Sequence, residues 1–266
     1  MTPVLIAVLV LGGISAVCAL LLVLASKYMA VPVDEKFPAL RSCLPGANCG
    51  ACGYAGCDGY ASALAAGEEE KTNKCIAGGN DVAVALAETL GVAAEAVVEV
   101  NAYVLCSGNC DVTQKRVDFQ GAKTCAAARL LFGGDGACGY GCLGYGDCAA
   151  VCHEHAINIV NGVARINDLR CMGCGTCART CPQQIIAVLP KEIDIFVGCS
   201  NHDRGPAVKA VCSAGCIGCG LCAKKCPNGA IKLLNNLPKV DYNTCIGCGE
   251  CGKACPVKCI HLGNKV

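Results

Sequence analysis

The amino-acid sequence predicts a small α+β protein with an N-terminal apolar helix, then a small helical unit, then two tandem repeats of short strands and helices. Three observations lead to this fold class. Residues 3–25 carry no charged side chain. The chain has 28 cysteines among 266 residues, and most of them recur at intervals of two or three residues. Residues 138–153 also align with residues 212–227 without a gap.

The uncharged N-terminal run is long enough to cross a membrane, because a spanning helix needs about 20 apolar residues. A signal peptide would have basic side chains before the run, whereas here Lys27, Lys36 and Arg41 all follow it. The positive-inside rule then places the rest of the chain in the cytoplasm. We therefore predict a transmembrane anchor at 1–28 and a linker at 29–40. The protein would cross the cell inner (cytoplasmic) membrane once, with its cysteine-rich domains on the cytoplasmic side.

Three units are predicted beyond the linker. Residues 41–102 join a cysteine group to an alanine- and valine-rich stretch that indicates one or two short helices broken near Gly91. Residues 103–196 and 197–266 form the two repeats, in which short strands alternate with cysteine loops. Strands this short cannot bury a large core, so bound metal groups are expected to supply part of it.

The two repeats match cysteine by cysteine, with departures in the first copy. Tyr145 stands where the second copy has Cys219, and His153 stands where it has Pro227. The first copy is therefore the degenerate one. The matching pairs are Cys106 with Cys199, Cys138 with Cys212, Cys142 with Cys216, Cys148 with Cys222, and Cys152 with Cys226.

The motif C-x2-C-x2-C-x3-C-P occurs three times, and its spacing indicates iron–sulfur ligands. Disulfide partners have no reason to recur at such intervals, whereas three cysteines on one tight loop can bind three irons of a four-iron cubane. A zinc scaffold is the alternative, but zinc does not require this run. The three copies are Cys171, Cys174, Cys177 and Cys181; Cys216, Cys219, Cys222 and Cys226; and Cys245, Cys248, Cys251 and Cys255.

In two-cluster ferredoxins the fourth cysteine of each motif binds the partner cluster, which predicts the ligand sets. In the second repeat, one set is Cys216, Cys219, Cys222 and Cys255, and the other is Cys245, Cys248, Cys251 and Cys226. In the first repeat, one set is Cys171, Cys174, Cys177 and Cys152. The other is Cys142, Cys148 and Cys181, with Cys138 replacing the ligand lost at Tyr145.

The remaining cysteines predict one further cluster and leave the total number of clusters at five or six. The N-terminal unit has four cysteines at short-short-long spacing that suit one cubane, namely Cys49, Cys52, Cys57 and Cys75. Five cysteines remain, and four of them would complete a sixth cluster between the repeats; the alternative is one or two structural thiols. The five are Cys106, Cys110, Cys125, Cys199 and Cys212. Five or six 4Fe–4S clusters are thus expected. Three thiols are interpreted as non-ligating: Cys18, Cys43 and Cys259.

Other chemistries find little support in the sequence. The net charge of +1 and an aromatic content of 4% give no indication of nucleic-acid binding. Gly139, Gly141 and Gly144 match a dinucleotide fingerprint, but no strand–helix unit surrounds them. Residues 247–254 resemble a phosphate-binding loop without its Ser/Thr. The four histidines lack metal-ligand spacing and are interpreted as surface groups. No catalytic residue is predicted.

The order of these parts is similar to that of a known family. An apolar helix, the loop LPGANCGACGYAGC at 44–57 with its distant Cys75, and two ferredoxin-type repeats resemble the B subunit of the Rnf complex, in its long form. The resemblance covers essentially the whole chain. Taken alone, the loop is also similar to one in corrinoid iron–sulfur proteins. His153 departs from the family's usual proline and puts the surroundings of one cluster in doubt.

The resemblance implies a subunit of an ion-translocating ferredoxin:NAD oxidoreductase. Such a subunit accepts electrons from soluble ferredoxin and relays them toward other membrane, flavin and NAD subunits, with NAD reduction coupled to Na+/H+ translocation and no NAD site in this chain. The alternative is a polyferredoxin subunit of a hydrogenase or heterodisulfide reductase, against which the Cys49–Cys75 unit argues. Four lysines near the C-terminal motifs could attract an acidic ferredoxin or could be ordinary solvated groups: Lys224, Lys225, Lys253 and Lys258.

Overall fold

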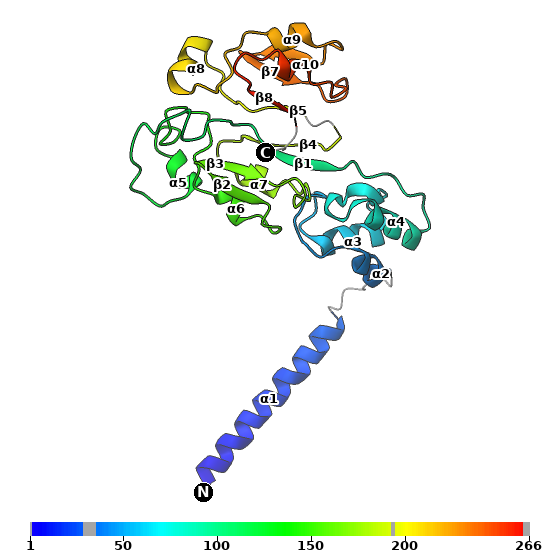
Figure 1. The fold of residues 1–266 in the computed structure, drawn as a ribbon. Coiled ribbons are helices and arrows are strands. Elements are labelled where there is room, and N and C mark those ends of the chain that lie inside the picture. The colour runs from blue at the N-terminus through cyan, green and yellow to red at the C-terminus, as the bar shows by residue number, and fades with distance from the viewer. Residues whose placement is uncertain (1, 29–35, 193–194, 263–266) are drawn as a thin grey trace.

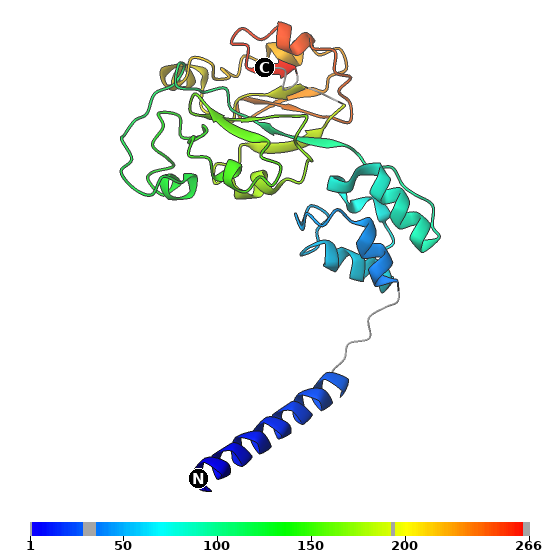
Figure 2. The same ribbon diagram turned by 60° about the horizontal axis from the view of Figure 1, so that its bottom comes forward.

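The computed structural model describes residues 2–28, 36–192 and 195–262. Figure 1 shows a long N-terminal helix, a small helical unit, and two cysteine-rich repeats that lie one above the other. The same layers are visible from a second direction in Figure 2. The α+β class expected from the sequence is confirmed for the cysteine-rich part of the chain.

The N-terminal segment is helical, as α1 covers Thr2–Tyr28. Among the described residues, however, no helix combines the length and the apolar character that crossing a membrane requires. The predicted transmembrane anchor at 1–28 is therefore not confirmed, and neither is the single-pass arrangement. Most of the predicted linker at 29–40 lies outside the described residues, and its last part already belongs to a helix that begins at Phe37.

The N-terminal unit is a cluster of short helices around one aliphatic and aromatic core. It contains α2 (Phe37–Cys43), α3 (Cys57–Ala65) and α4 (Gly79–Leu90), with short 3-10 turns at Thr72–Lys74 and Ile76–Gly78. Leu40, Tyr60 and Leu86 are completely buried between the helices. Gly91 ends α4 in the left-handed conformation, with a φ of 71°. The helix break expected near Gly91 is thus confirmed, and the alanine- and valine-rich stretch before it forms the single helix α4.

The described part of the two repeats contains four two-stranded antiparallel sheets. In the first repeat, β1 (Val100–Val104) pairs with β4 (Ile186–Pro190), and β2 (Ile157–Val160) pairs with β3 (Val163–Ile166). In the second repeat, β5 (Ile195–Val197) pairs with β8 (Ile260–Leu262), and β6 (Ile231–Leu234) pairs with β7 (Leu237–Val240). The strand pairing therefore reproduces the sequence repeat, with an outer strand pair and an inner hairpin in each copy.

Short helices carry the cysteine loops between these strands. Four of them occupy equivalent places: α6 (Asp147–Ala150), α7 (Thr176–Thr180), α9 (Leu221–Lys225) and α10 (Glu250–Lys253). Each begins after a glycine with positive φ, at Gly146, Gly175, Gly220 and Gly249. The two others, α5 (Cys125–Arg129) and α8 (Gly205–Val211), lie in the longer connections.

The core of each repeat mixes aliphatic side chains with cysteine sulfurs. In the first repeat Val163 and Ile185 are almost fully buried beside Cys148 and Cys177. The second repeat has the same arrangement around Ile231 and Cys222. Sulfur atoms occupy positions that aliphatic side chains would fill in a larger domain, as expected for modules too small to be stable on burial alone.

We predict that Gly173→Ala destabilises the protein more than Gly247→Ala. Both glycines hold the same motif position with φ near +70°, so alanine costs about 1–2 kcal/mol of strain at each. At Gly173 a Cβ would also lie 2.3 Å from the Val100 carbonyl oxygen, whereas at Gly247 nothing lies within 4 Å. Such overpacking adds about 1–3 kcal/mol.

The measurement is the apparent melting temperature of both full-length variants, prepared without oxygen and followed by visible absorption. Gly173→Ala should melt about 4 °C or more below the Gly247→Ala control. Equal melting temperatures would show that the close approach of Val100 to the cysteine loop is not present.

Candidate iron–sulfur sites

Four pockets in the described structure are each lined by at least four cysteines. Their volumes are similar, at about 330, 380, 400 and 480 Å³ when their open mouths are included. All 28 thiols are free of disulfide bonds. The same set of donors indicates one kind of occupant for all four pockets.

The first pocket brings together the predicted cysteines of the N-terminal unit: Cys49, Cys52, Cys57 and Cys75. Asn48 holds the loop against the start of α3, because its Oδ1 accepts a hydrogen bond from the Cys57 backbone N–H at 2.9 Å. Burial raises the pKa of the Cys75 thiol above its ordinary value. Cys43 lies apart from this group, with its Sγ 3.4 Å from the Ala39 carbonyl oxygen.

The second pocket also unites a predicted set: Cys152, Cys171, Cys174 and Cys177. The Ala156 backbone N–H donates to the Cys152 sulfur at 3.3 Å. Burial raises the pKa of the Cys177 thiol to about 11. The guanidinium of Arg179, on α7, donates to the Cys49 carbonyl oxygen at 2.8 Å, so this pocket and the N-terminal pocket belong to adjoining loops.

The third pocket differs from the predicted set in one ligand. Cys142, Cys148 and Cys181 line it as expected, but their fourth partner is Cys125 and not Cys138. Cys125 is the first residue of α5, and the Asp147 carboxylate at the start of α6 accepts its backbone N–H at 2.8 Å. The segment that carries Cys125 has no counterpart in the second repeat. Two features of the sequence could have indicated Cys125 as the fourth cysteine. They are this insertion and the missing cysteine at Tyr145.

Tyr145 itself has become part of a polar network beside the third pocket. Its hydroxyl donates to the Asp135 carboxylate at 2.6 Å, and Lys115 forms an ion pair with the same carboxylate. Burial alone would raise the pKa of Asp135, which is 1% exposed, but the hydrogen bonds from Lys115 and Tyr145 outweigh burial and hold that pKa below its ordinary value. The position equivalent to Cys219 is thus occupied by a stable structural contact.

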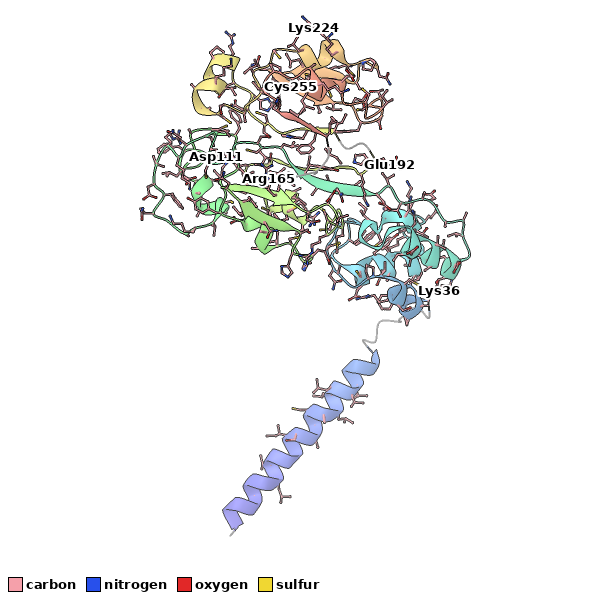
Figure 3. All side chains as sticks on the ribbon, in the orientation of Figure 1. Lys36, Asp111, Arg165, Glu192, Lys224 and Cys255 are labelled. Atoms are coloured by element: carbon pink, nitrogen blue, oxygen red, sulfur yellow. The ribbon has the colours of Figure 1, made fainter. Side chains whose placement is uncertain are left out.

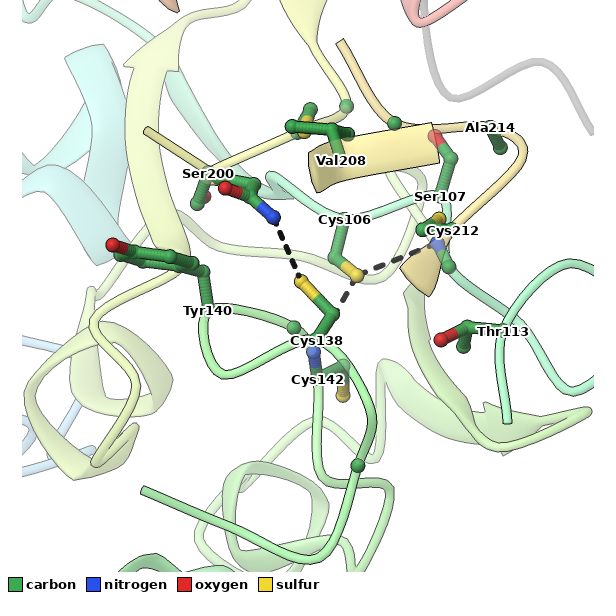
Figure 4. A pocket seen from close by; sticks show the side chains of 17 residues that line it. Cys106, Ser107, Thr113, Cys138, Tyr140, Cys142, Ser200, Val208, Cys212 and Ala214 are labelled. Carbon is green, nitrogen blue, oxygen red and sulfur yellow. Dashed lines mark hydrogen bonds between the residues drawn. The ribbon is translucent and has the colours of Figure 1, made fainter. Parts of the chain in front are cut away.

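The fourth pocket lies between the repeats. Four of its lining cysteines line none of the other three cysteine pockets, and they are Cys106, Cys138, Cys199 and Cys212. Figure 4 shows Cys106, Cys138 and Cys212 around the cavity, with dashed hydrogen bonds that end on two of the sulfurs. Of the five cysteines expected to supply a central cluster, Cys110 is exposed and absent from the lining, and Cys125 belongs to the third pocket.

The C-terminal motifs gather their sulfurs in the core of the second repeat. Cys222 lies among Cys216, Cys219 and Cys255, which is the predicted set. Cys251 lies near Cys245 and Cys248, and Cys226 packs against the same core. Cys219 and Cys248 are exposed, unlike the thiols of the other motifs.

Cys259 brings a fifth thiol to the first of these C-terminal sets. Its sulfur is 3.6 Å from the sulfur of Cys255, and its side chain is 1% exposed. Cys259 also interacts with Cys216, whose thiol pKa it lowers. The sequence indicates a thiol apart from the ligands at this position, whereas the structure places Cys259 beside two of them.

The donor chemistry of these sites fits iron–sulfur clusters. Every pocket offers thiols, and backbone N–H groups point at some of the sulfurs, as cluster ligands require. Within residues 2–28, 36–192 and 195–262, no three His, Cys, Asp or Glu side chains are arranged to hold a single metal ion. One histidine prediction needs correction, since His261 is half-buried and its Nε2 lies 2.7 Å from the Ser107 hydroxyl.

Family models match three parts of the chain. Residues 44–77 match a model described as a putative Fe-S cluster, residues 164–187 a 4Fe-4S binding domain, and residues 215–259 a 4Fe-4S dicluster domain. The fold and the thiol groups therefore define a ferredoxin-type protein that binds several 4Fe–4S clusters.

Whole-chain relatives make the family specific. The B subunit of the Na(+)-translocating ferredoxin:NAD(+) oxidoreductase complex from Acetobacterium woodii is 38% identical over 91% of this chain and 73% of its own length. Its proton-translocating counterpart from Clostridium ljungdahlii is 40% identical over 91% of this chain and 85% of its own. The B subunit of the ion-translocating oxidoreductase complex from Methanosarcina acetivorans is 36% identical over 87% of this chain and 88% of its own length. The chain belongs to this family of B subunits.

We predict that Cys125→Ser loses iron from the third pocket, because serine keeps the size of the side chain but removes the thiolate ligand. Iron should fall by up to about four atoms per chain, the content of one cubane. Cys43→Ser is the matched control and should keep full iron, since the Cys43 sulfur contacts Ala39 and Thr89 instead of a ligand group. Iron and sulfide analysis of anaerobically purified protein measures both, and unchanged iron in Cys125→Ser would refute the assignment.

Proposed function

We propose that this chain is the electron-transfer subunit of an ion-translocating ferredoxin:NAD oxidoreductase complex. It accepts electrons from a reduced ferredoxin and relays them toward NAD reduction, which other subunits of the complex carry out. One combined observation carries this proposal. The chain has pockets lined by four cysteines each, and about nine tenths of its length matches subunits of complexes with that activity. A polyferredoxin of a hydrogenase or heterodisulfide reductase accounts less well for the unit at 44–77.

The residues that would hold the clusters also control their surroundings. A bound 4Fe–4S cluster supplies reversible one-electron chemistry, with a potential set by charge, hydrogen bonds to sulfur and exposure. Buried thiols such as Cys148 and Cys177 exclude water from the first repeat. Backbone N–H groups that donate to sulfur, such as that of Ala156 to Cys152, stabilise negative charge on the ligands. Five sites follow from the predicted motifs and Cys125.

The second repeat is the proposed docking site for ferredoxin. Two thiols of its motifs, Cys219 and Cys248, are exposed, so a partner can approach these ligands closely. Exposed lysines follow them on the adjoining helices α9 and α10, and Figure 3 shows Lys224 at the outer edge of the repeat. The group comprises Lys224 and Lys225 on α9, Lys253 on α10, and Lys258, which follows α10. Such a positive surface complements an acidic ferredoxin and accelerates its encounter with the chain.

The docking experiment is the rate at which a reduced acidic ferredoxin reduces the full-length chain. The double variant Lys224→Glu, Lys225→Glu should lower this rate about tenfold or more at low salt, and the dependence on salt should weaken. Lys71→Glu, an exposed lysine of the N-terminal unit, is the control with one charge reversed and should leave the rate nearly unchanged.

The two possible failures of this test have different meanings. Equal rates in all three proteins would remove the docking site but leave electron transfer intact. Failure of ferredoxin to reduce the unchanged protein, despite a full iron content, would overturn the proposed function.

We further propose that the uncharged run at 3–25 attaches the chain to the membrane. Its support is the sequence pattern and membership in a family of membrane-complex subunits. Full-length protein should remain with membranes after carbonate extraction, whereas a chain that begins at residue 36 should be released. Release of both would contradict the attachment.

A further inference from the structure

We propose that Cys106, Cys138, Cys199 and Cys212 bind a sixth 4Fe–4S cluster between the two repeats. None of the three matching family models includes these residues, because the models cover 44–77, 164–187 and 215–259. The inference rests on the proposed electron-transfer function and extends it, since it adds a site that joins the clusters of the two repeats.

The four cysteines are two pairs of equivalent residues. In the internal alignment Cys106 matches Cys199, and Cys138 matches Cys212. Each repeat thus gives one cysteine that follows its first strand and one that precedes its first ligand loop. The pocket takes the same two positions from each copy, so it lies on the approximate twofold axis that relates the repeats.

The hydrogen bonds around the pocket obey the same symmetry. The Cys142 backbone N–H donates to the Cys106 sulfur at 3.4 Å, and the equivalent Cys216 N–H donates to the Cys199 sulfur at 3.3 Å. The N–H that donates in each repeat therefore belongs to a cysteine of the adjoining predicted cluster. Two equivalent contacts this similar show that both copies hold these thiols in the same conformation.

Contacts between the repeats bring the two halves of the pocket together. The Ser107 N–H donates to the Gly198 carbonyl at 2.9 Å, and the Ser200 hydroxyl donates to the Leu105 carbonyl at 2.9 Å. The two contacts are reciprocal, because Ser107 is equivalent to Ser200 and Leu105 is equivalent to Gly198 in the internal alignment. The Thr113 hydroxyl donates to the Val211 carbonyl at 2.7 Å and fixes the chain just before Cys212.

The chemistry of the pocket suits a thiolate-bound cluster. Cys106, Cys199 and Cys212 are 7–8% exposed, and Val208 and Ala214 form an apolar wall. The Asn201 side-chain amide donates to the Cys138 sulfur at 3.5 Å. A Cβ at Gly108 would lie 3.5 Å from the sulfurs of both Cys106 and Cys212, so a glycine stands where two prospective ligands approach the backbone. Like the other three cysteine pockets, this one presents at least four thiols to a single cavity.

The test compares Cys138→Ser and Cys212→Ser with Cys110→Ser in anaerobically purified full-length protein. The unchanged protein should contain about 24 irons per chain, four for each of six cubanes. Each of the first two variants should lose up to about four irons. Cys110→Ser should lose none, because Cys110 is exposed and absent from the pocket.

The outcomes separate this inference from the proposed function. About 20 irons in the unchanged protein, or about one zinc per chain with 20 irons, would overturn the sixth cluster and leave electron transfer standing. A count near 24 that is insensitive to both serine variants would reject these ligands. If a serine variant does not fold, an iron count near 20 in the unchanged protein still overturns the sixth cluster.

Loss of the central cluster should also interrupt the path between repeats. With limiting ferredoxin, Cys138→Ser should accept electrons in its C-terminal clusters as fast as the unchanged protein, but reduction of the remaining clusters should slow at least tenfold. Uniformly fast reduction would contradict a bridging role, and no reduction of any cluster in the unchanged protein would instead contradict the proposed function.

Discussion

The constraint on which this structure depends is that cysteine sulfurs must face one another within pockets formed by very short elements. The strands of the repeats have three to five residues and the helices of the ligand loops have four or five. Elements this short bury little apolar surface, and each sheet has only two strands, which is marginal in isolation. Metal binding that requires the folded arrangement of thiols contributes directly to the free energy of folding. The free energy of folding and the free energy of cofactor binding are therefore coupled.

A single local structure, used four times, satisfies that constraint. Each ligand loop ends in a cysteine that is followed, three residues later, by a residue with positive φ, at His155, Gln184, Gly229 and Lys258. The N–H of that residue returns to the carbonyl of the cysteine in all four copies, at 3.0–3.3 Å. The next residue is always buried, and the four are Ala156, Ile185, Ala230 and Cys259. Three of these side chains are apolar, so the thiol of Cys259 is a specific addition to one site and not part of the common plan.

Much of this arrangement could be predicted from the sequence, because ligand spacing within one loop is a local property. The N-terminal unit, the set around Cys152 and the set around Cys222 each bring together the cysteines that the spacing indicated. The helix break at Gly91 and the α+β class are local in the same sense. Local patterns also indicated the duplication that organises the strand pairs.

The errors concern cysteines that lie outside the recurring motifs. The sequence offers Cys138 as the replacement for the ligand lost at Tyr145, yet proximity in sequence does not determine which wall of a pocket a loop forms. Cys125 reaches that pocket through an insertion anchored by Asp147, and no spacing rule anticipates such an anchor. Cys110 lies on the surface although it is only four residues from Cys106.

Duplication explains why the central pocket exists at all. A single repeat would expose its Cys106 and Cys138 equivalents on one face, where two thiols cannot enclose a cubane. Two copies packed face to face bring four such thiols to the axis between them, and the reciprocal contacts of Ser107 and Ser200 hold the faces in register. Symmetric association of identical surfaces is self-complementary by geometry, because each contact occurs twice. The loss of a motif cysteine at Tyr145, compensated by Cys125, then shows how one copy could diverge without disturbing the shared axis. The thiols that line the central pocket come from both copies, so a change at one of them in either copy alters the junction between the two.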